Sequence, residues 1–282
     1  MDREPAVAGR FYPADRSVLA AQVDSFLASP ADGWAGDAGG GLQRQAAPGP
    51  ALPALGLLAP HAGYVYSGGI AGATYARVMV PDRAIVLCPN HTGRGEAVSL
   101  WPGGAWRTPL GRVPVDAAMT ADLLSSGAVT PDVEAHRLEH ALEVQLPFLQ
   151  ARNPGVAISA LCLGPLSWAA CRDLGLAVAG AAQRHGALVV ASSDMSHYLP
   201  ASEARQKDAR ALERILALDP QGLHEVVRRE RISMCGFVPA TVMLVAALQR
   251  GAREAQLVRY GHSGEASGDD SSVVGYAGVV VR

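Results

Sequence analysis

The sequence predicts an α/β protein folded as a three-layer αβα domain, with a mainly parallel or mixed sheet at its centre. One observation leads to this fold class and a second to a single domain. Short apolar runs typical of buried strands alternate with helical patterns along nearly the whole chain, as expected when helices cover both faces of one sheet. No internal repeat divides the 282 residues, so we expect a single domain over residues 1–282.

The first part of the chain predicts one helix followed by a long loop. After an extended entry, residues 16–28 place Leu19, Val23 and Leu27 on one helical face. Residues 30–53 are rich in Gly, Pro and Ala and have no periodicity. We expect a flexible loop there.

The stretch 55–93 predicts a strand–helix–strand unit around which the rest of the chain is organised. Its apolar runs, 55–59 and 84–88, are typical of strands buried on both faces. Each run is followed by a proline and, within two further residues, by a histidine, His61 or His91. Parallel strands of such a unit end at the same edge of the sheet, so both histidines should face one crevice.

The alternation continues beyond residue 93. Residues 97–101 and 106–113 are expected to be strands joined by a Pro-Gly-Gly turn. Helices are predicted at 116–125, 138–151 and 167–185, as a pair across 201–230, and at 239–250, with strands at 156–163, 187–192, 256–260 and 272–281.

Composition narrows the classes of partner and location. With 24 Lys and Arg against 26 Asp and Glu, the chain gives no electrostatic reason to expect nucleic acid or an acidic membrane surface. No apolar run approaches the roughly 20 residues of a membrane span, and residues 1–15 lack the apolar core of a signal peptide. We therefore expect a cytoplasmic protein. The four cysteines include no C-x-x-C pair, which disfavours a zinc ribbon or a disulfide framework.

Two further places carry residues suited to chemistry. Asp194 and His197 follow the predicted strand 187–192, again where open α/β sheets place their sites. Cys235 precedes Gly236 at the entry to an apolar helix, where the helix dipole favours a thiolate that ligates metal or acts as a nucleophile. Two histidines and one anionic ligand would leave open positions on a divalent metal.

A competing motif predicts a different site. His136, Glu139 and His140 spell H-x-x-E-H, the pattern of a zinc peptidase in which two helical histidines bind the metal and the glutamate activates water. The apolar stripe fits better if the helix begins near Leu138, which leaves His136 in the preceding loop. His140 and Glu143 would then share one helical face.

An ordered series of seven blocks resembles the Memo family, known in bacteria and archaea as the B protein of the AmmeMemoRadiSam system. The resemblance extends over nearly the whole chain from REPAVAGRFYP onward, and only residues 30–53 are peculiar to this sequence. The blocks are APHAGYVYSGG, CPNH, WRTPLG, EHALEVQLPFLQ, SSDMSHY, the CG before a Pro-led helix, and GDDSSVVGYAG.

The resemblance implies a fold similar to the class III extradiol, LigB-type dioxygenases, which are non-haem iron enzymes. It also implies which positions form the site. The metal positions of the Memo pattern match His61, His91 and Cys235. Asp194 and His197 match its SSD-x-x-H block, which lines the same cleft, and His140 and Glu143 match its EH-x-x-E block.

These implications lead to two hypotheses of function. In the first, the chain is a redox enzyme that uses Fe(II) or Cu, with Zn as an alternative, because a thiolate in place of the dioxygenase glutamate is softer and oxidisable. His197 would be the general acid and base, Asp194 would orient a ligand histidine, and His140 with Glu143 would bind substrate or relay protons.

In the second hypothesis the same cleft is a non-catalytic module that binds a peptide or a partner protein. The family name implies AMMECR-domain and radical-SAM proteins as partners, and eukaryotic Memo proteins are regarded as binders of phosphotyrosine peptides. The ligand of the cleft would be a small molecule in the first case and a peptide in the second.

Overall fold

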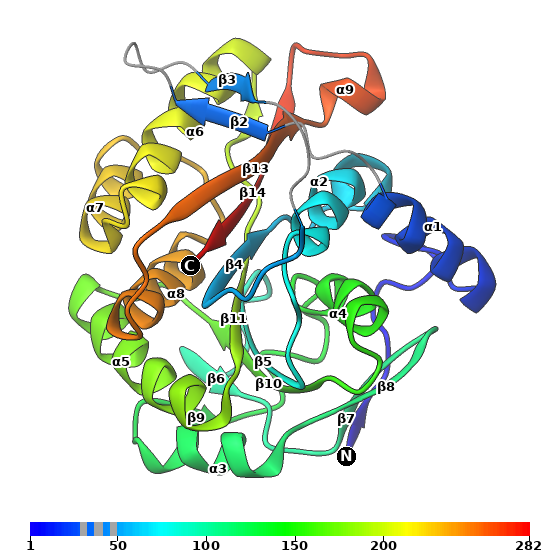
Figure 1. Cartoon of the computed structure of the whole chain (residues 1–282), viewed down its shortest axis with the longest axis vertical. Coiled ribbons are helices and arrows are strands. Elements are labelled where there is room, and N and C mark those ends of the chain that lie inside the picture. The colour runs from blue at the N-terminus through cyan, green and yellow to red at the C-terminus, as the bar shows by residue number, and fades with distance from the viewer. Residues whose placement is uncertain (29–32, 37–41, 46–49) are drawn as a thin grey trace.

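The computed structural model describes residues 1–28, 33–36, 42–45 and 50–282. A mixed sheet lies between two groups of helices (Figure 1). The predicted α/β fold with three layers is therefore confirmed. Among the described residues, no helix is long and apolar enough to cross a membrane.

Four parallel strands form the centre of the sheet, and antiparallel strands flank them on both sides. The central strands, in spatial order, are β4 (Gly56–Ala59), β11 (Leu188–Ser192), β5 (Arg83–Pro89) and β10 (Ala157–Leu163). Beyond β4 lie β14 (Val273–Val281), β13 (Ala255–His262) and β12 (His197–Leu199), and beyond β10 lie β6 (Val98–Leu100) and β9 (Thr130–Pro131).

Strand β11 lies between the two strands of the predicted strand–helix–strand unit. Both β4 and β5 pair with it in parallel. Their carboxyl ends therefore meet at one edge of the sheet, as predicted, and the end of β11 lies between them.

The helices divide between the two faces of the sheet (Figure 1). One face is covered by α1 (Arg16–Ala28), α2 (Tyr64–Ala76) and α4 (Leu146–Arg152). The other is covered by α3 (Ala117–Ser125), α5 (Trp168–His185), α6 (Ala201–Leu216), α7 (Pro220–Arg229) and α8 (Phe237–Gln249), and the short α9 (Gly264–Ser267) connects β13 to β14. Successive strand residues alternate between two cores, with Leu57 on the first side and Leu58 on the second.

Local signals in the sequence fix several helix ends. The Asp116 side chain accepts a hydrogen bond from the Met119 N–H at the start of α3. Helix α5 starts after Ser167, which caps it in the same way, and ends at Gly186, whose φ of 63° suits glycine. The helix boundaries predicted at 16–28, 116–125 and 167–185 are thus confirmed to within one residue.

The helix predicted at 138–151 is wrong over its first half. The structure has a 3-10 turn, η1 (Glu143–Gln145), before α4, and residues 133–142 form an irregular loop. The backbone groups of this loop have partners outside a helical pattern. Arg3 donates to the carbonyl oxygens of His136 and Glu139, and the Glu139 carboxylate accepts from the Ala141 N–H.

The strand predicted at 106–113 is a hairpin. Its arms are β7 (Ala105–Thr108) and β8 (Gly111–Pro114), and β1 (Asp2–Arg3) pairs in parallel with β7 in a small separate sheet. The chain turns at Pro109, which cannot donate a ladder hydrogen bond. Strand β6 pairs with β10 instead of with this hairpin.

The loop predicted at 30–53 contains a pair of strands. Strands β2 (Gly33–Gly36) and β3 (Leu42–Gln45) pair antiparallel, which the composition of the segment did not indicate. The rest of that prediction falls largely on residues 30–32, 37–41 and 46–49, which lie outside the described residues.

Candidate metal centre

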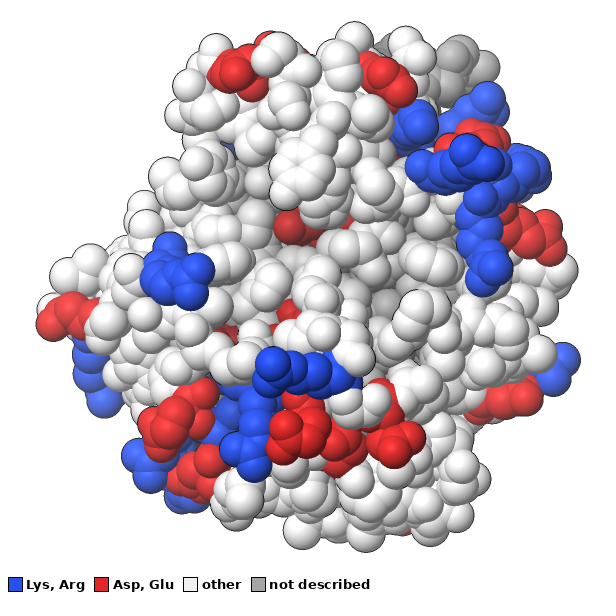
Figure 2. Space-filling view, turned by 180° about the vertical axis from the view of Figure 1, so that it is seen from behind, with Lys and Arg blue, Asp and Glu red and all other residues white. Residues whose placement is uncertain are grey.

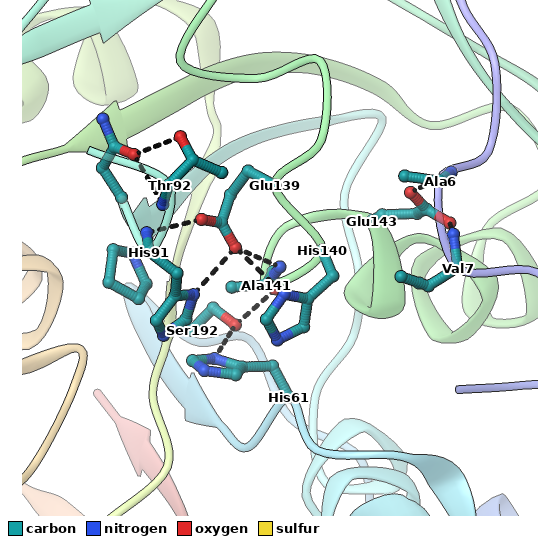
Figure 3. Close-up of polar contacts among 12 residues, drawn as sticks. Ala6, Val7, His61, His91, Thr92, Glu139, His140, Ala141, Glu143 and Ser192 are labelled. Carbon is teal, nitrogen blue, oxygen red and sulfur yellow. Dashed lines mark hydrogen bonds and ion pairs between the residues drawn. The ribbon is translucent and has the colours of Figure 1, made fainter. Parts of the chain in front are cut away.

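The carboxyl edge of the sheet brings three histidine rings together. His61 follows β4 and His91 follows β5, and their ring centroids lie 5.2 Å apart. His140, from the irregular loop, lies 4.9 Å from His91 and 5.5 Å from His61. Figure 3 shows the three rings turned toward one shared space.

Cys235 completes this cluster from the start of α8. Its Sγ lies 3.2 Å from His61 Nε2, and one donor atom each from His61, His91 and Cys235 lie within 4.8 Å of one another. Gly236 permits this approach, because a Cβ there would lie 2.2 Å from the Ser192 carbonyl oxygen. The predicted ligands thus form one candidate metal-binding group.

The hydroxyl of Ser192 determines which nitrogen of His61 carries the proton. Ser192 Oγ donates to the Ala141 carbonyl oxygen at 2.6 Å and accepts from the Gln145 amide at 2.8 Å. With its only hydrogen used, it accepts from His61 Nδ1, 2.9 Å away. The lone pair of His61 is therefore on Nε2, which faces Cys235.

The carboxylate of Glu139 does the same for His91. One oxygen accepts from the His91 backbone N–H at 2.6 Å, and the other lies 2.9 Å from its ring Nδ1. A carboxylate only accepts, so Nδ1 holds the proton and Nε2 is left as a ligand atom. Metal-binding histidines commonly donate their other N–H to a carboxylate or similar acceptor in this way.

The pKa values of the two ligand histidines shift in opposite directions. Burial, reinforced by the neighbouring histidines His91 and His140, lowers the pKa of His61 well below its usual value, so the ring is neutral, as a ligand must be. Burial also lowers the pKa of His91, but the bond to Glu139 outweighs this effect and raises it.

The thiol of Cys235 differs from the expectation that the helix dipole stabilises a thiolate. Burial, together with the nearby Asp194, raises its pKa well above that of a free cysteine. An activated nucleophile has a lowered pKa, so this raised pKa speaks against a nucleophile. As a metal ligand, grouped with His61 and His91, the thiol would lose its proton to the ion itself.

Asp194 and His197 both lie beside this cluster. The Asp194 carboxylate accepts from the His61 backbone N–H at 2.7 Å, so it anchors the main chain of His61 while Ser192 orients the ring. Burial raises the pKa of Asp194 to about 6. His197 Nδ1 donates to the Ser233 carbonyl oxygen at 2.9 Å, which places its lone pair on Nε2.

Comparison with known proteins identifies the family. A family model described as Memo-like protein matches residues 3–280. The chain belongs to the Memo family. It is 41% identical to a MEMO1 family protein of Methanopyrus kandleri, over 100% of this chain and 99% of the relative. It is 38% identical to MEMO1 family proteins of Methanothermobacter thermautotrophicus (98% and 99% covered) and Aquifex aeolicus (99% and 98%).

Among solved structures, the chain is similar to an uncharacterized protein of Escherichia coli K12. The two share 17% sequence identity with a TM-score of 0.49, and the match covers 79% of this chain and 98% of the other.

Glu143, of the Memo-type EH-x-x-E block, does not share a helical face with His140, because the helix begins later than predicted. Its carboxylate is buried and points away from the three histidines, toward the N-terminal segment (Figure 3). It accepts hydrogen bonds from Arg3, the Ala6 and Val7 N–H groups and the Tyr12 hydroxyl. The geometry therefore gives no support to a role in binding substrate.

The zinc-peptidase arrangement is not formed. His136 lies in the loop, fully buried, with its ring centroid 5.8 Å from those of both Trp101 and Trp106. Among the described residues it belongs to neither group of donor atoms close enough to hold a metal, whereas His140 and Glu139 form such a group with His91.

The sequence did not indicate that Ser192 and Glu139 orient the rings of His61 and His91. Ser192 was treated only as the end of a strand, and Glu139 only as part of the peptidase motif. Ser192 could have been found, because it ends a buried strand at the same edge as His61. The contact of Glu139 with His91 joins residues 48 positions apart through an irregular loop, and no local pattern indicates it.

A pocket of about 140 Å³ opens beside the ligands. His91, Asn90 and Cys235 supply its polar groups, and its apolar wall is formed mainly by Leu163, Phe237 and Val238. A cavity of roughly 150 Å³ accommodates a molecule of the size of benzene. The pocket therefore suits a small ligand.

Proposed function

We propose that this Memo protein is a metal-dependent redox enzyme whose ion, iron or copper, is held by His61, His91 and Cys235. One observation carries the proposal. Ser192 and Glu139 fix the Nδ1 protons of the two imidazoles, and one donor atom from each of His61, His91 and Cys235 lies close enough to the others to share an ion. When bound, such an ion supplies one-electron redox chemistry and open coordination positions.

The residues around the ligands support proton transfer to a small substrate. His197 has its Nε2 lone pair available, because Nδ1 donates to Ser233, and an imidazole is the side chain best suited to general acid–base work near neutral pH. Burial lowers the pKa of His140, which makes its ring a neutral acceptor. The small pocket beside His91 and Cys235 would hold the substrate and limit access of water.

Metal analysis of protein purified anaerobically without a histidine tag tests the proposal. We expect near-stoichiometric iron or copper in the wild type and its loss in His91→Ala and Cys235→Ala. His185→Ala and Cys171→Ala are matched controls, because these residues lie in α5, outside the donor group, and should keep the metal. Absence of metal from the wild type, even after reconstitution with Fe(II) or Cu, would overturn the proposal, and stoichiometric Zn would replace redox chemistry by Lewis-acid chemistry.

A second candidate function rests on exposed apolar side chains next to the site histidines. Val65 and Tyr66, in the first turn of α2, are 70% and 46% exposed, and Tyr198, beside His197, is 78% exposed. Burial raises the pKa of Tyr276, and the nearby Asp194, Tyr66 and Tyr198 raise it further. Tyrosine is enriched among the few residues that carry most of the binding energy of protein interfaces.

These side chains support a binding module for a peptide or for the AMMECR-domain and radical-SAM proteins. The test is binding of the purified candidate partners to the wild type, Cys235→Ser and Tyr66→Ala/Tyr198→Ala. The module hypothesis predicts binding that survives Cys235→Ser and is lost in the tyrosine variant. Equal binding by the tyrosine variant would contradict it.

A further inference from the structure

The buried side chain of Arg3 hydrogen-bonds the N-terminal segment to the irregular loop 133–142 beside the candidate metal centre. Arg3 is only 3% exposed. Its Nε donates to the His136 carbonyl oxygen at 2.8 Å and its Nη2 to the Glu139 carbonyl oxygen at 2.6 Å. Its planar group also lies over the Trp106 ring, 4.2 Å from the centroid.

The charge of Arg3 is balanced by Glu143. Arg3 Nη1 lies 2.6 Å from the Glu143 carboxylate, which is 0% exposed. The same carboxylate accepts from the Tyr12 hydroxyl at 2.6 Å and from the Ala6 N–H at 2.8 Å. Residues 3–12, here called the strap, are thereby tied to the chain on both sides of Glu139.

The position of Glu139 depends on these contacts. Residues 133–142 form no regular helix. The Glu139 carbonyl oxygen accepts from Arg3, and the His136 carbonyl oxygen accepts from Arg3 and from the Glu139 N–H. Without Arg3 the Glu139 carbonyl oxygen would lose its donor and the His136 carbonyl oxygen one of its two, which favours another arrangement of the loop. The carboxylate of Glu139, held by this loop, is the group that accepts the Nδ1 proton of His91.

We propose that Arg3 is a positioning residue for the metal centre. By holding the carbonyl oxygens of the loop it fixes Glu139, and Glu139 keeps His91 in the tautomer that carries its proton on Nδ1 and leaves Nε2 as the ligand atom. The consequence for metal affinity rests on the proposed function, whereas the consequence for the tautomer of His91 does not.

Arg3→Lys separates this role from simple stabilisation of the strap, because lysine keeps the charge beside Glu143 but cannot reach both carbonyl oxygens with a planar fork. Tyr12→Phe is the matched control, since it removes another strap contact to Glu143 and leaves residues 136–139 untouched. Nitrogen-15 correlation spectra of the histidine side chains report the His91 tautomer in metal-free protein. Co²⁺ titration, followed by the thiolate charge-transfer band of Cys235, reports affinity.

In Arg3→Lys we expect a mixture of His91 tautomers and an affinity for Co²⁺ about 10- to 100-fold weaker, the usual effect of losing a group that orients a metal-binding histidine. Tyr12→Phe should match the wild type in both measurements. A single unchanged tautomer together with unchanged affinity in Arg3→Lys would overturn the proposal.

The role of Arg3 can still be tested if the wild type binds no Co²⁺ or if Arg3→Lys does not fold. If the wild type binds no Co²⁺, the proposed function fails, and the tautomer comparison still decides the role of Arg3. If Arg3→Lys does not fold, Arg3→Gln/Glu143→Gln removes both charges of the pair and leaves no unpaired buried ion. The same two measurements on that variant then support or overturn the proposal.

Discussion

Two acceptors decide which nitrogen each site histidine offers. Ser192 Oγ takes the Nδ1 proton of His61 and the Glu139 carboxylate takes that of His91. Neither acceptor belongs to the donor group formed by His61, His91 and Cys235. Their contribution is to fix ring orientation and tautomer before any ligand arrives, which reduces the cost of assembling the site.

Ser192→Ala tests this contribution. The variant removes the acceptor of the His61 Nδ1 proton, and metal affinity should fall about 10- to 100-fold. Isothermal titration with Co²⁺ under anaerobic conditions would measure the change. Ser159→Ala is the control, because Ser159 is also buried in the sheet but bonds to Thr120, and it should bind as the wild type. Equal affinity in the two variants would contradict the role assigned to Ser192.

His136 should make stability depend on pH. Burial, with the nearby Arg3 charge, lowers its pKa to about 4 in the folded protein, whereas an unfolded histidine has a pKa of about 6.5. Below pH 6.5 only the unfolded chain takes up this proton, so the stabilisation present above pH 6.5 is lost as the pH falls toward 4, by about 3 kcal/mol in total.

The variant His136→Phe keeps a ring of similar size between Trp101 and Trp106 and removes the titration. Urea unfolding of both proteins between pH 7 and 4 would measure the free energy of unfolding. We expect a flatter dependence in the variant, by up to about 1.4 kcal/mol per pH unit. Parallel curves for the two proteins would show that His136 is not the titrating group.

At the scale of elements, the irregular loop 133–142 shows how tertiary contacts override a helical pattern. The leucine stripe predicted a helix from Leu138, but Arg3 and Glu139 hold the backbone groups in another arrangement. Arg3 comes from a segment more than 130 positions away in the sequence. The result is a loop that turns Glu139 and His140 toward the site.

Helices α1 and α2 pack closely because α2 carries glycines at their contact. A Cβ on Gly72 would lie 2.5 Å from the backbone of Phe26 in α1. Gly72→Ala should therefore force the helices apart and lower the free energy of unfolding by about 1–3 kcal/mol, measured by urea denaturation.

Gly69→Ala is the matched control for Gly72→Ala within the same helix. A Cβ there would have only Arg259 Nη1 nearby, at an ordinary 3.6 Å. Alanine also favours a helix over glycine, so this variant should gain up to about 1 kcal/mol. If Gly72→Ala were as stable as Gly69→Ala, the close packing of α1 on α2 would not require a glycine at position 72.

At the scale of the whole molecule, the candidate ligands come from β4, β5 and the start of α8, which belong to distant parts of the chain. Charged side chains on the face in Figure 2 are intermixed in sign, in line with the near-neutral composition. A shared ion would add a link between segments that already meet through the sheet, the two cores and hydrogen bonds such as that from the Gly236 N–H to Ser193 Oγ.

Binding of an ion at this site should stabilise the entire fold. An ion that binds the folded state alone adds about 2.7 kcal/mol to the free energy of unfolding at 100 times its dissociation constant. Anaerobic urea denaturation with and without Co²⁺ would measure this gain. We expect it in the wild type and not in His91→Ala. A gain of equal size in both would place the ion elsewhere.

The sequence by itself determined the fold class, most elements and three candidate ligands. Alternating apolar runs and helical stripes depend on side-chain period alone, and polar residues just past buried strands must gather at one edge of a parallel sheet. His61 and His91 were predictable for this reason, and Cys235 from its place at the start of an apolar helix. The Memo resemblance was confirmed by the family match.

The tertiary structure alone decided which residues orient those ligands. Arg3, Glu139, Glu143 and Ser192 act through hydrogen bonds that join segments far apart in the chain. Such contacts leave no periodic or spacing signal, because a buried polar group is satisfied by whichever donor or acceptor the fold brings near. That is why Glu143 was predicted beside His140 and lies instead with the N-terminal strap.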